Sequence, residues 1–589
     1  MPTGWHSKLW QRFARRRERK CAVARGRASR RPFVRLVAHF LARLVRGGND
    51  AASSEFELGA GGLLGLLAAP GAFSCLLMLD KYSTFLNWYR GRIRDDLYVT
   101  SYPDKYLFIA LAMAVTGIVT VLKWDKILPD SQDYLNLAPL PVRPRSIFLA
   151  NAAAIAIAVI VLAVDVSGVS TVLFPMIVTA GAQQTTAAFV AFISVHAACM
   201  LLASCFTFCA VFALLGTLGA LLPQNAFRSI SSWVRGGALV GFIVLLMTGC
   251  AGPNVVAQMV GMGRLRLFPS FWYLGLYQAL QHRPAPALAE SAHLALPGVV
   301  AAFLLMLVSY ALSYHRRFVS VLERGRRASG ERLVALFLRP LDLFSARTAG
   351  FARACHHFAV RALLRNEAHR LCLSVALGLG WLLAIQSISE GTESGFLKAP
   401  LIAAYVLLLG VRLAFELPAG VAANWVFRAV LDPRENESHS LARRVMLGFL
   451  TPFVLLPSLV FAWWRSGMMT SAIETAFVLA LSLCLMDVLL SGYRKIPLAC
   501  SAPGFRENLL VLCLLQFMGF ELFTHGGALL EAAILKQPAL FLVVPTAMLA
   551  GSYWRRVRWK NALEAGEAEV GLTFESFRRP AVERLNLSD

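Results

Sequence analysis

The sequence predicts an all-α fold, a polytopic transmembrane helical bundle of about twelve spans arranged as six plus six, with an N-terminal interfacial amphipathic helix. Of the 589 residues, 57% are hydrophobic and only 16% are charged, and the mean hydropathy is +0.59. Soluble domains carry about a quarter charged residues. The hydrophobic residues also come in blocks that are long enough, or nearly so, to cross a hydrocarbon core of about 30 Å. Because the blocks lack the alternating polar face of barrel strands, helices are the expected spanning element.

Twelve hydrophobic blocks follow one another, six on each side of an arginine-rich segment. The first six lie at residues 58–79, 106–122, 147–166, 186–222, 238–250 and 295–314. The other six lie at 371–388, 400–415, 446–464, 472–490, 509–523 and 539–553. Pro70 and Gly71 interrupt the first block, which leaves open whether it spans fully or is re-entrant.

The net charge of +24 would favour nucleic-acid binding in a soluble protein. Its distribution favours a different reading. Residues 1–57 hold 14 basic and 4 acidic side chains, and residues 315–370 hold 12 arginines and 4 acidic side chains, all outside the hydrophobic blocks. If both termini are cytoplasmic, 46 of the 58 Lys and Arg residues fall on the inner side, as the positive-inside rule requires. We therefore expect a plasma-membrane protein of the bacterial inner-membrane type, with cytoplasmic termini and no nucleic-acid partner.

These patterns divide the chain into six parts. They are a basic extension predicted to be disordered (1–31), an interfacial amphipathic helix (32–46), a first six-span half (47–314), an Arg-rich cytoplasmic linker (315–370), a second six-span half (371–553) and a cytoplasmic tail (554–589).

The predicted amphipathic helix separates a basic face from an apolar face. Arg35, Arg43 and Arg46 lie on one side at helical spacing, and six apolar residues lie on the other: Phe33, Leu36, Val37, Phe40, Leu41 and Leu44. A basic amphipathic helix just before a first span is expected to lie on the inner leaflet, where its arginines contact anionic lipid. The alternative is a surface helix that packs on the protein itself.

No enzyme signature is present, so we expect neither catalytic residues nor a cofactor or metal in this chain. The sequence lacks a G-x-x-x-x-G-K-[ST] phosphate loop, an H-E-x-x-H zinc motif and a G-x-S-x-G nucleophile elbow. The eleven cysteines are scattered without a C-x-x-C pair, which favours core packing. Polar residues inside the blocks mark transport paths in carriers. Seven such residues are found here: Asp165, His196, Gln386, Arg412, Asp487, Gln516 and Glu521. Most of them lie near block ends, and His196 is the titratable residue that lies well inside its block.

The segment between the second and third blocks is the most specific feature. Residues 123–151 read KWDKILPDSQDYLNLAPLPVRPRSIFLAN. Four prolines forbid one continuous helix but allow a short helix at 131–137. This helix carries an aromatic and aliphatic centre with an acidic rim, which suits docking on a basic partner: Asp130, Asp133, Tyr134, Leu135 and Leu137. The alternative is an ordinary loop packed on the helix ends.

This layout resembles the permease subunits of type 2 ATP-binding-cassette exporters over about residues 32–320. The similarity lies in the amphipathic helix, the short inner helix with its "P-L-P" turn, and the long loop 251–294 before the sixth span. The resemblance implies that the short helix is a coupling helix that docks on a separate ATPase, and that the long loop is an outer re-entrant region. The second half lacks the "P-L-P" string, and the resemblance makes residues 432–440 its candidate for an equivalent docking segment.

The expected function is therefore that of a permease component that couples a separate ATPase to substrate export. Its partners are that ATPase and the lipid bilayer, while accessory subunits and the substrate stay open. Two alternatives remain, an ATP-independent secondary transporter and a membrane enzyme or assembly scaffold without transport. The scarcity of charged residues at mid-membrane disfavours the first of them.

Overall fold

The computed structural model describes most of the helical part of the chain. The described residues are 32–45, 60–83, 101–127, 144–181, 184–250, 267–282, 286–322, 350–417, 419, 438–491, 493, 497–498, 509–537 and 539–564. Within these ranges all regular structure is helical. Nine described helices are long and apolar enough to cross a membrane: Tyr102–Leu122, Arg145–Ala180, Thr186–Leu221, Ile230–Cys250, Leu288–Ser313, Glu367–Ser389, Glu393–Ala414, His439–Ser466 and Met468–Leu489. The expectation of an all-α, multi-pass membrane protein is confirmed at this level.

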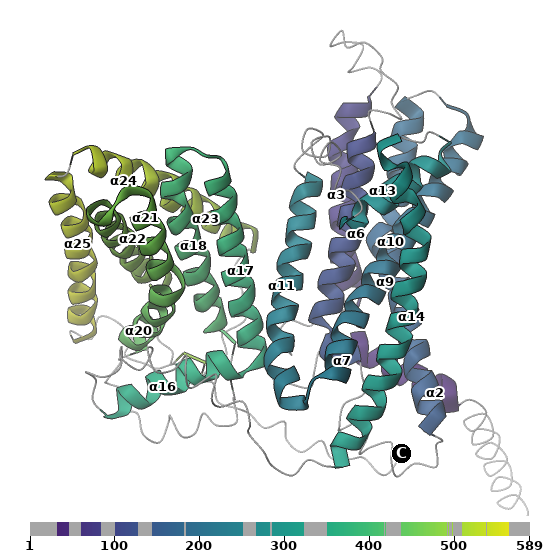
Figure 1. Ribbon diagram of the computed structural model, residues 1–589, viewed down its shortest axis with the longest axis horizontal. Coiled ribbons are helices and arrows are strands. Elements are labelled where there is room, and N and C mark those ends of the chain that lie inside the picture. The colour runs from purple at the N-terminus through teal and green to yellow at the C-terminus, as the bar shows by residue number, and fades with distance from the viewer. Residues whose placement is uncertain are drawn as a thin grey trace, which may run out of the picture. The chain divides into compact units, whose positions relative to one another are not determined.

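The chain forms two compact units (Figure 1). The first comprises Met1–Leu221 and Phe242–Arg324, and the second comprises Leu222–Gly241 and Gly325–Asp589. Helix α11 (Gln224–Cys250) contributes residues to both units. The main division, after Arg324, falls in the Arg-rich segment that separates the two groups of hydrophobic blocks.

The first unit is built around helix α10. Its other helices are α2 (Pro32–Val45), α3 (Ala60–Tyr82), α6 (Tyr102–Leu122), α7 (Trp124–Ile127), α9 (Pro144–Gly181), α13 (Pro269–Leu280) and α14 (Pro286–Leu322). Helix α10 (Thr186–Leu221) packs against α6, α9, α13 and α14. It has no polar face because a helix enclosed by neighbours is apolar all round. Helix α13 is a short helix of 12 residues inside the predicted outer loop before the last helix of this unit.

An aromatic core joins the helices of the first unit. Phe174 of α9 is fully buried and its ring contacts those of Tyr82, Phe108, Phe192 and His196. These partners come from α3, α6 and α10, so one side chain links four helices. Such aromatic contacts add stabilisation beyond burial alone.

The second unit is built around helix α18 (Glu393–Ala414). The other elements are α16 (Gly350–Arg365), α17 (Glu367–Ser389), α20 (Ser438–Leu450), η5 (Thr451–Leu455), α21 (Leu456–Ser466), α22 (Met468–Leu489), α23 (Leu509–Glu521), η6 (Leu522–Gly526), α24 (Gly527–Lys536) and α25 (Ala539–Glu564). Helix α18 packs against α17, α20, α22 and α24. Side chains cap the starts of α17 and α18, where Asn366 accepts from Ala368 N at 3.1 Å and Thr392 accepts from Gly395 N at 3.0 Å.

Two π-helical turns keep long helices continuous in the second unit. The turn η5 contains Pro452, which has no N–H to donate to the preceding turn, and a widened turn accommodates it. The turn η6 contains the polar string Thr524-His525-Gly526. The sequence pattern ends a hydrophobic block at residue 523, but the helix continues through η6 into α24 and ends at Lys536. Glu531 therefore lies on a helix and not in a loop.

Candidate functional site

Helix α2 packs on the protein and also keeps an exposed apolar end. Leu36 and Phe40 are 9% and 1% exposed and form a cluster with Ala150 and Ala154 of α9. At the start of the helix the large side chain of Phe33 is 41% exposed. The described helix thus has features of both sequence-based alternatives, the surface helix packed on protein and the helix that contacts lipid.

The three arginines predicted to contact the membrane surface differ in their surroundings. Arg35 is exposed and Arg43 is half-buried. Arg46 lies outside the described residues. The predicted docking residues Asp130, Asp133, Tyr134, Leu135 and Leu137 also lie outside the described residues, as do residues 432–437 of the second docking segment.

Contacts to the core of the first unit flank the predicted docking loop, residues 128–143, on both sides. Before the loop, Trp124 of α7 is 1% exposed and its ring meets that of Phe212 on α10 edge-on, with centroids 5.2 Å apart. After the loop, Asn151 of α9 donates from Nδ2 to the carbonyl oxygen of Ile127 at 3.3 Å and to the hydroxyl of Tyr310 at 3.0 Å. Helix α2 contacts both α7 and α9. The helix that precedes residues 128–143 and the helix that follows them therefore belong to one packed frame made by α7, α9, α10 and α14.

A buried lysine holds the short helix α13 in the first unit. Lys105, which directly precedes the predicted hydrophobic block 106–122, lies in the first turn of α6 and is fully buried. Its Nζ donates to Oε1 of Gln281 at 2.6 Å and lies 5.3 Å from the ring centroid of Tyr277. His196, the titratable residue deepest in its hydrophobic block, contacts the hydroxyl of Tyr277 through Nδ1 at 2.9 Å. Cation–π and hydrogen-bond contacts of this kind fasten α13 to α6 and α10, so this cluster is structural.

A charged cluster occupies one end of the second unit. Arg465 of α21 donates from Nη2 to Oε1 of Glu474 on α22 at 2.8 Å, and its guanidinium lies 5.1 Å from the ring centroid of Phe396. Glu474 also lines a cavity of about 340 Å³ among α17, α18, α21 and α22. Glu531 of α24 is 1% exposed. Sequence reasoning missed all three charged residues. It assigned Arg465 and Glu531 to loops and did not count Glu474, although Glu474 lies inside the block 472–490.

The opposite ends of α18 and α22 carry a second set of charges. Arg412 pairs with Glu416 and donates from Nε to the carbonyl oxygen of Leu489 at 3.0 Å. Asp487 pairs with Arg443 at 3.4 Å and accepts a hydrogen bond from Ser552. These pairs lie at helix ends, as the sequence pattern predicts for anchoring residues.

The other polar residues identified within the blocks have varied surroundings. The Oε1 atom of Gln516 accepts a hydrogen bond from the hydroxyl of Tyr405. The side chains of Gln386 and Glu521 are exposed, and that of Asp165 is half-buried. They are not brought together in one site among the described residues.

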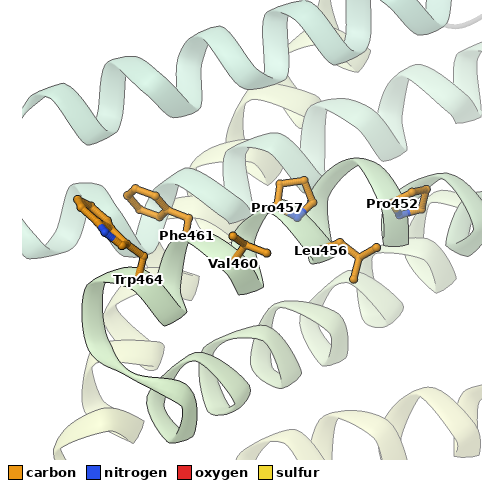
Figure 2. Close-up of a pocket in the computed structure, with 6 residues that line it drawn as sticks. All are labelled: Pro452, Leu456, Pro457, Val460, Phe461 and Trp464. Atoms are coloured by element: carbon orange, nitrogen blue, oxygen red, sulfur yellow. The ribbon is translucent and has the colours of Figure 1, made fainter.

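A shallow apolar groove runs along one face of η5 and α21 (Figure 2). Its side chains are Pro452, Leu456, Pro457, Val460, Phe461 and Trp464. Trp464, at the end of α21, is 83% exposed. An exposed apolar face that ends in tryptophan is typical of the boundary between the bilayer core and the headgroups. The groove therefore has the features of a lipid-facing surface.

A search of the described residues for metal ligands and a comparison with known proteins both gave negative results. Among the described residues no group of three or more His, Cys, Asp and Glu side chains is placed to hold a metal ion. Comparison of the chain with family models, curated proteins and solved structures gives no match.

Proposed function

We propose that this chain is the membrane-spanning permease of an ATP-binding-cassette exporter, driven by a separate ATPase. The observation that supports the proposal is the set of contacts made by the residues that flank 128–143 on both sides. The contact of Trp124 with Phe212 and the hydrogen bonds of Asn151 attach both ends of this loop to the helices of the first unit. A docking loop needs such a frame, because a push on a loosely attached loop would not reach the helices.

The route of the mechanical coupling follows from these contacts. Movement of the loop displaces α7 and the start of α9, and Trp124 transmits the displacement to α10 through Phe212. Helix α10 packs against four other helices of the first unit, so its tilt changes the whole bundle. The ATPase supplies the chemistry, and this chain supplies the substrate path.

Twelve crossings are part of the same proposal. Three helical stretches, α3, α23–η6–α24 and α25, coincide with predicted blocks and add to the nine described candidate spans. Helix α3 is continuous through Pro70 for 23 residues, or about 35 Å, which is enough to span a bilayer. An even number of crossings places both termini on the same side of the membrane, and the positive-inside rule assigns that side, with its basic segments, to the cytoplasm. In this arrangement Arg35 and Arg43 of α2 lie at the inner leaflet of the plasma membrane.

The topology makes a direct prediction for reporter fusions. A reporter that is active only in the cytoplasm should be active when fused after residue 589. It should be silent when inserted at Glu390, in the turn between α17 and α18. The measurement is reporter activity normalised to the amount of inserted protein. Activity at Glu390 with silence at the C-terminus would overturn the twelve-span arrangement.

Replacing Tyr134 and Leu135 together by alanine should weaken the complex with the ATPase by about 2–4 kcal/mol, since truncation of an anchor residue costs about this much. The chain should still insert and fold, because neither residue is expected in a span. The measurement is the amount of ATPase that co-purifies with the tagged chain in mild detergent.

The matched control is Trp464→Ala, which removes an exposed aromatic side chain placed on the opposite side of the membrane and should leave the complex intact. If the double variant is degraded in the cell, the loop is a structural element. If the double variant is stable and active and no ATPase accompanies the wild type, an ATP-independent carrier or a scaffold is the better account.

A further inference from the structure

Helix α24 contains a carboxyl group that is enclosed by the second unit. Glu531 is 1% exposed, and both of its carboxyl oxygens are buried without a hydrogen-bond partner among the described residues. Its helix packs against α18, α22 and α25, and its neighbours Ala528 and Ile534 are also buried. An ionised carboxylate in such surroundings is costly unless an opposite charge or a set of donors compensates it.

Helix α24 packs against α22, which carries Glu474, so that the charges of Glu474 and its partner Arg465 act on the carboxyl of Glu531. Arg465 is already engaged in its ion pair with Glu474 at 2.8 Å and in its contact with the ring of Phe396. Two ionised carboxylates beside one guanidinium would leave the cluster with one uncompensated negative charge. A single bound proton removes that charge.

Other titratable side chains occur on the elements that pack against α24, or on its own segment. They are Glu393, Lys398, Tyr405 and Arg412 on α18, Cys484 and Asp487 on α22, Tyr553, Arg555 and Arg558 on α25, Glu521 on α23, His525 on η6 and Lys536 on α24 itself. Arg412 and Asp487 are paired at the opposite end of the unit, and Tyr405 donates to Gln516. Arg465 and Glu474 remain the charges that act on the carboxyl of Glu531.

We propose that Glu531 and Glu474 form a proton-binding carboxyl pair, in which Glu531 holds the proton while Glu474 remains paired with Arg465. The proton binds to one carboxylate oxygen of Glu531, and no other bond changes. A metal ion fits this site less well, because Arg465 repels a cation and the described residues provide no group of three ligands. This inference concerns the second unit alone and does not depend on the identity of the ATPase.

The cavity beside the pair gives the proton a route. Glu474 lies in its wall, together with the polar side chains of Ser458 and Thr475. A cavity of about 340 Å³ has room for water molecules, and Glu474 and Arg465 are the charged residues in its mainly apolar wall. Water that enters this cavity would reach Glu474, from which the proton passes to Glu531. A buried carboxyl with such access is the arrangement that proton-linked membrane proteins use.

Infrared spectroscopy of the purified protein in lipid nanodiscs tests the proposal. At neutral pH the wild type should show the C=O stretch of a protonated carboxylic acid, shifted by exchange into D₂O, and Glu531→Gln should lack this band. The matched control is Glu521→Gln, which changes an exposed glutamate on the same helical segment and should keep the band. In Glu474→Gln the band should weaken, because Arg465 becomes available to Glu531 and favours its ionised form.

A second measurement uses the wild type alone, so it does not depend on the folding of a variant. A hydrophobic carbodiimide modifies protonated carboxyls in apolar surroundings, and peptide mass spectrometry should find the adduct on Glu531 and not on Glu521. The proposal is overturned if the wild type shows neither the band nor the adduct at neutral pH. It is equally overturned if the band persists unchanged in Glu531→Gln.

Discussion

Replacing Phe174 by alanine should destabilise the first unit by about 3 kcal/mol, because it removes the side chain that joins four helices. Its ring is fully buried against Tyr82, Phe108, Phe192 and His196. Loss of a buried phenylalanine costs about 3–5 kcal/mol in soluble proteins, where a cavity and lost transfer energy both contribute. The lower end applies in a membrane, since lipid also solvates apolar side chains and the packing contacts then carry most of the energy.

The effect is measured as a shift of the thermal unfolding midpoint of the purified protein in a fixed detergent. The matched control is Phe73→Ala on α3, where the ring is 62% exposed and its removal leaves no internal cavity. Equal shifts for Phe174→Ala and Phe73→Ala would show that the aromatic core does not hold this unit together.

Replacing Gly410 by alanine should force α17 and α18 apart and destabilise the second unit by about 1–3 kcal/mol. A Cβ atom at this position would lie 2.2 Å from the Cβ of Ala376. The alanine methyl group is fixed to the backbone and cannot move aside, so the helices themselves must shift. Small residues at the contact between membrane helices allow this close approach.

Gly551→Ala in α25 is the matched control, since a Cβ there has no neighbour within 4 Å. Alanine favours a helix over glycine by up to about 1 kcal/mol, so this variant should be as stable as the wild type or slightly more stable. Thermal unfolding of both variants in one detergent gives the comparison. A Gly410→Ala protein as stable as Gly551→Ala would contradict the close α17–α18 contact.

Much of the helical layout could be predicted from hydrophobic blocks alone. The block 371–388 differs from helix α17 by only a few residues, because charged and turn-forming residues mark both of its ends. The block 147–166 is much shorter than α9, which continues to Gly181. Serine, threonine and proline in the extension lower the hydropathy of the pattern, but Ser170 and Thr179 hydrogen-bond to carbonyls of their own helix and so remain compatible with it.

The charged sites could not be predicted in the same way, because they depend on contacts between distant parts of the chain. From the sequence alone Lys105 resembles a loop residue. Its burial depends on a hydrogen bond to Gln281, which is 176 positions away in the chain. Glu531 follows a string of polar residues and glycines that resembles a turn, and only the π-helical turn η6 shows that the helix continues. The signal available from sequence was Glu474, an acidic residue inside a hydrophobic block, because such residues are costly in membranes and usually have a partner.

The exporter proposal requires the ATPase to lie against the loop that contains Tyr134. Site-specific photo-cross-linking tests this position directly. A photoreactive phenylalanine analogue is introduced at Tyr134, within the proposed docking loop, and separately at Glu390, in the turn that the proposed topology places on the other side of the membrane. We expect the analogue at residue 134 to form an adduct with a nucleotide-binding ATPase subunit, and the analogue at residue 390 to form none. An active protein that gives no ATPase adduct from residue 134, or that gives one from residue 390, would contradict the proposed exporter.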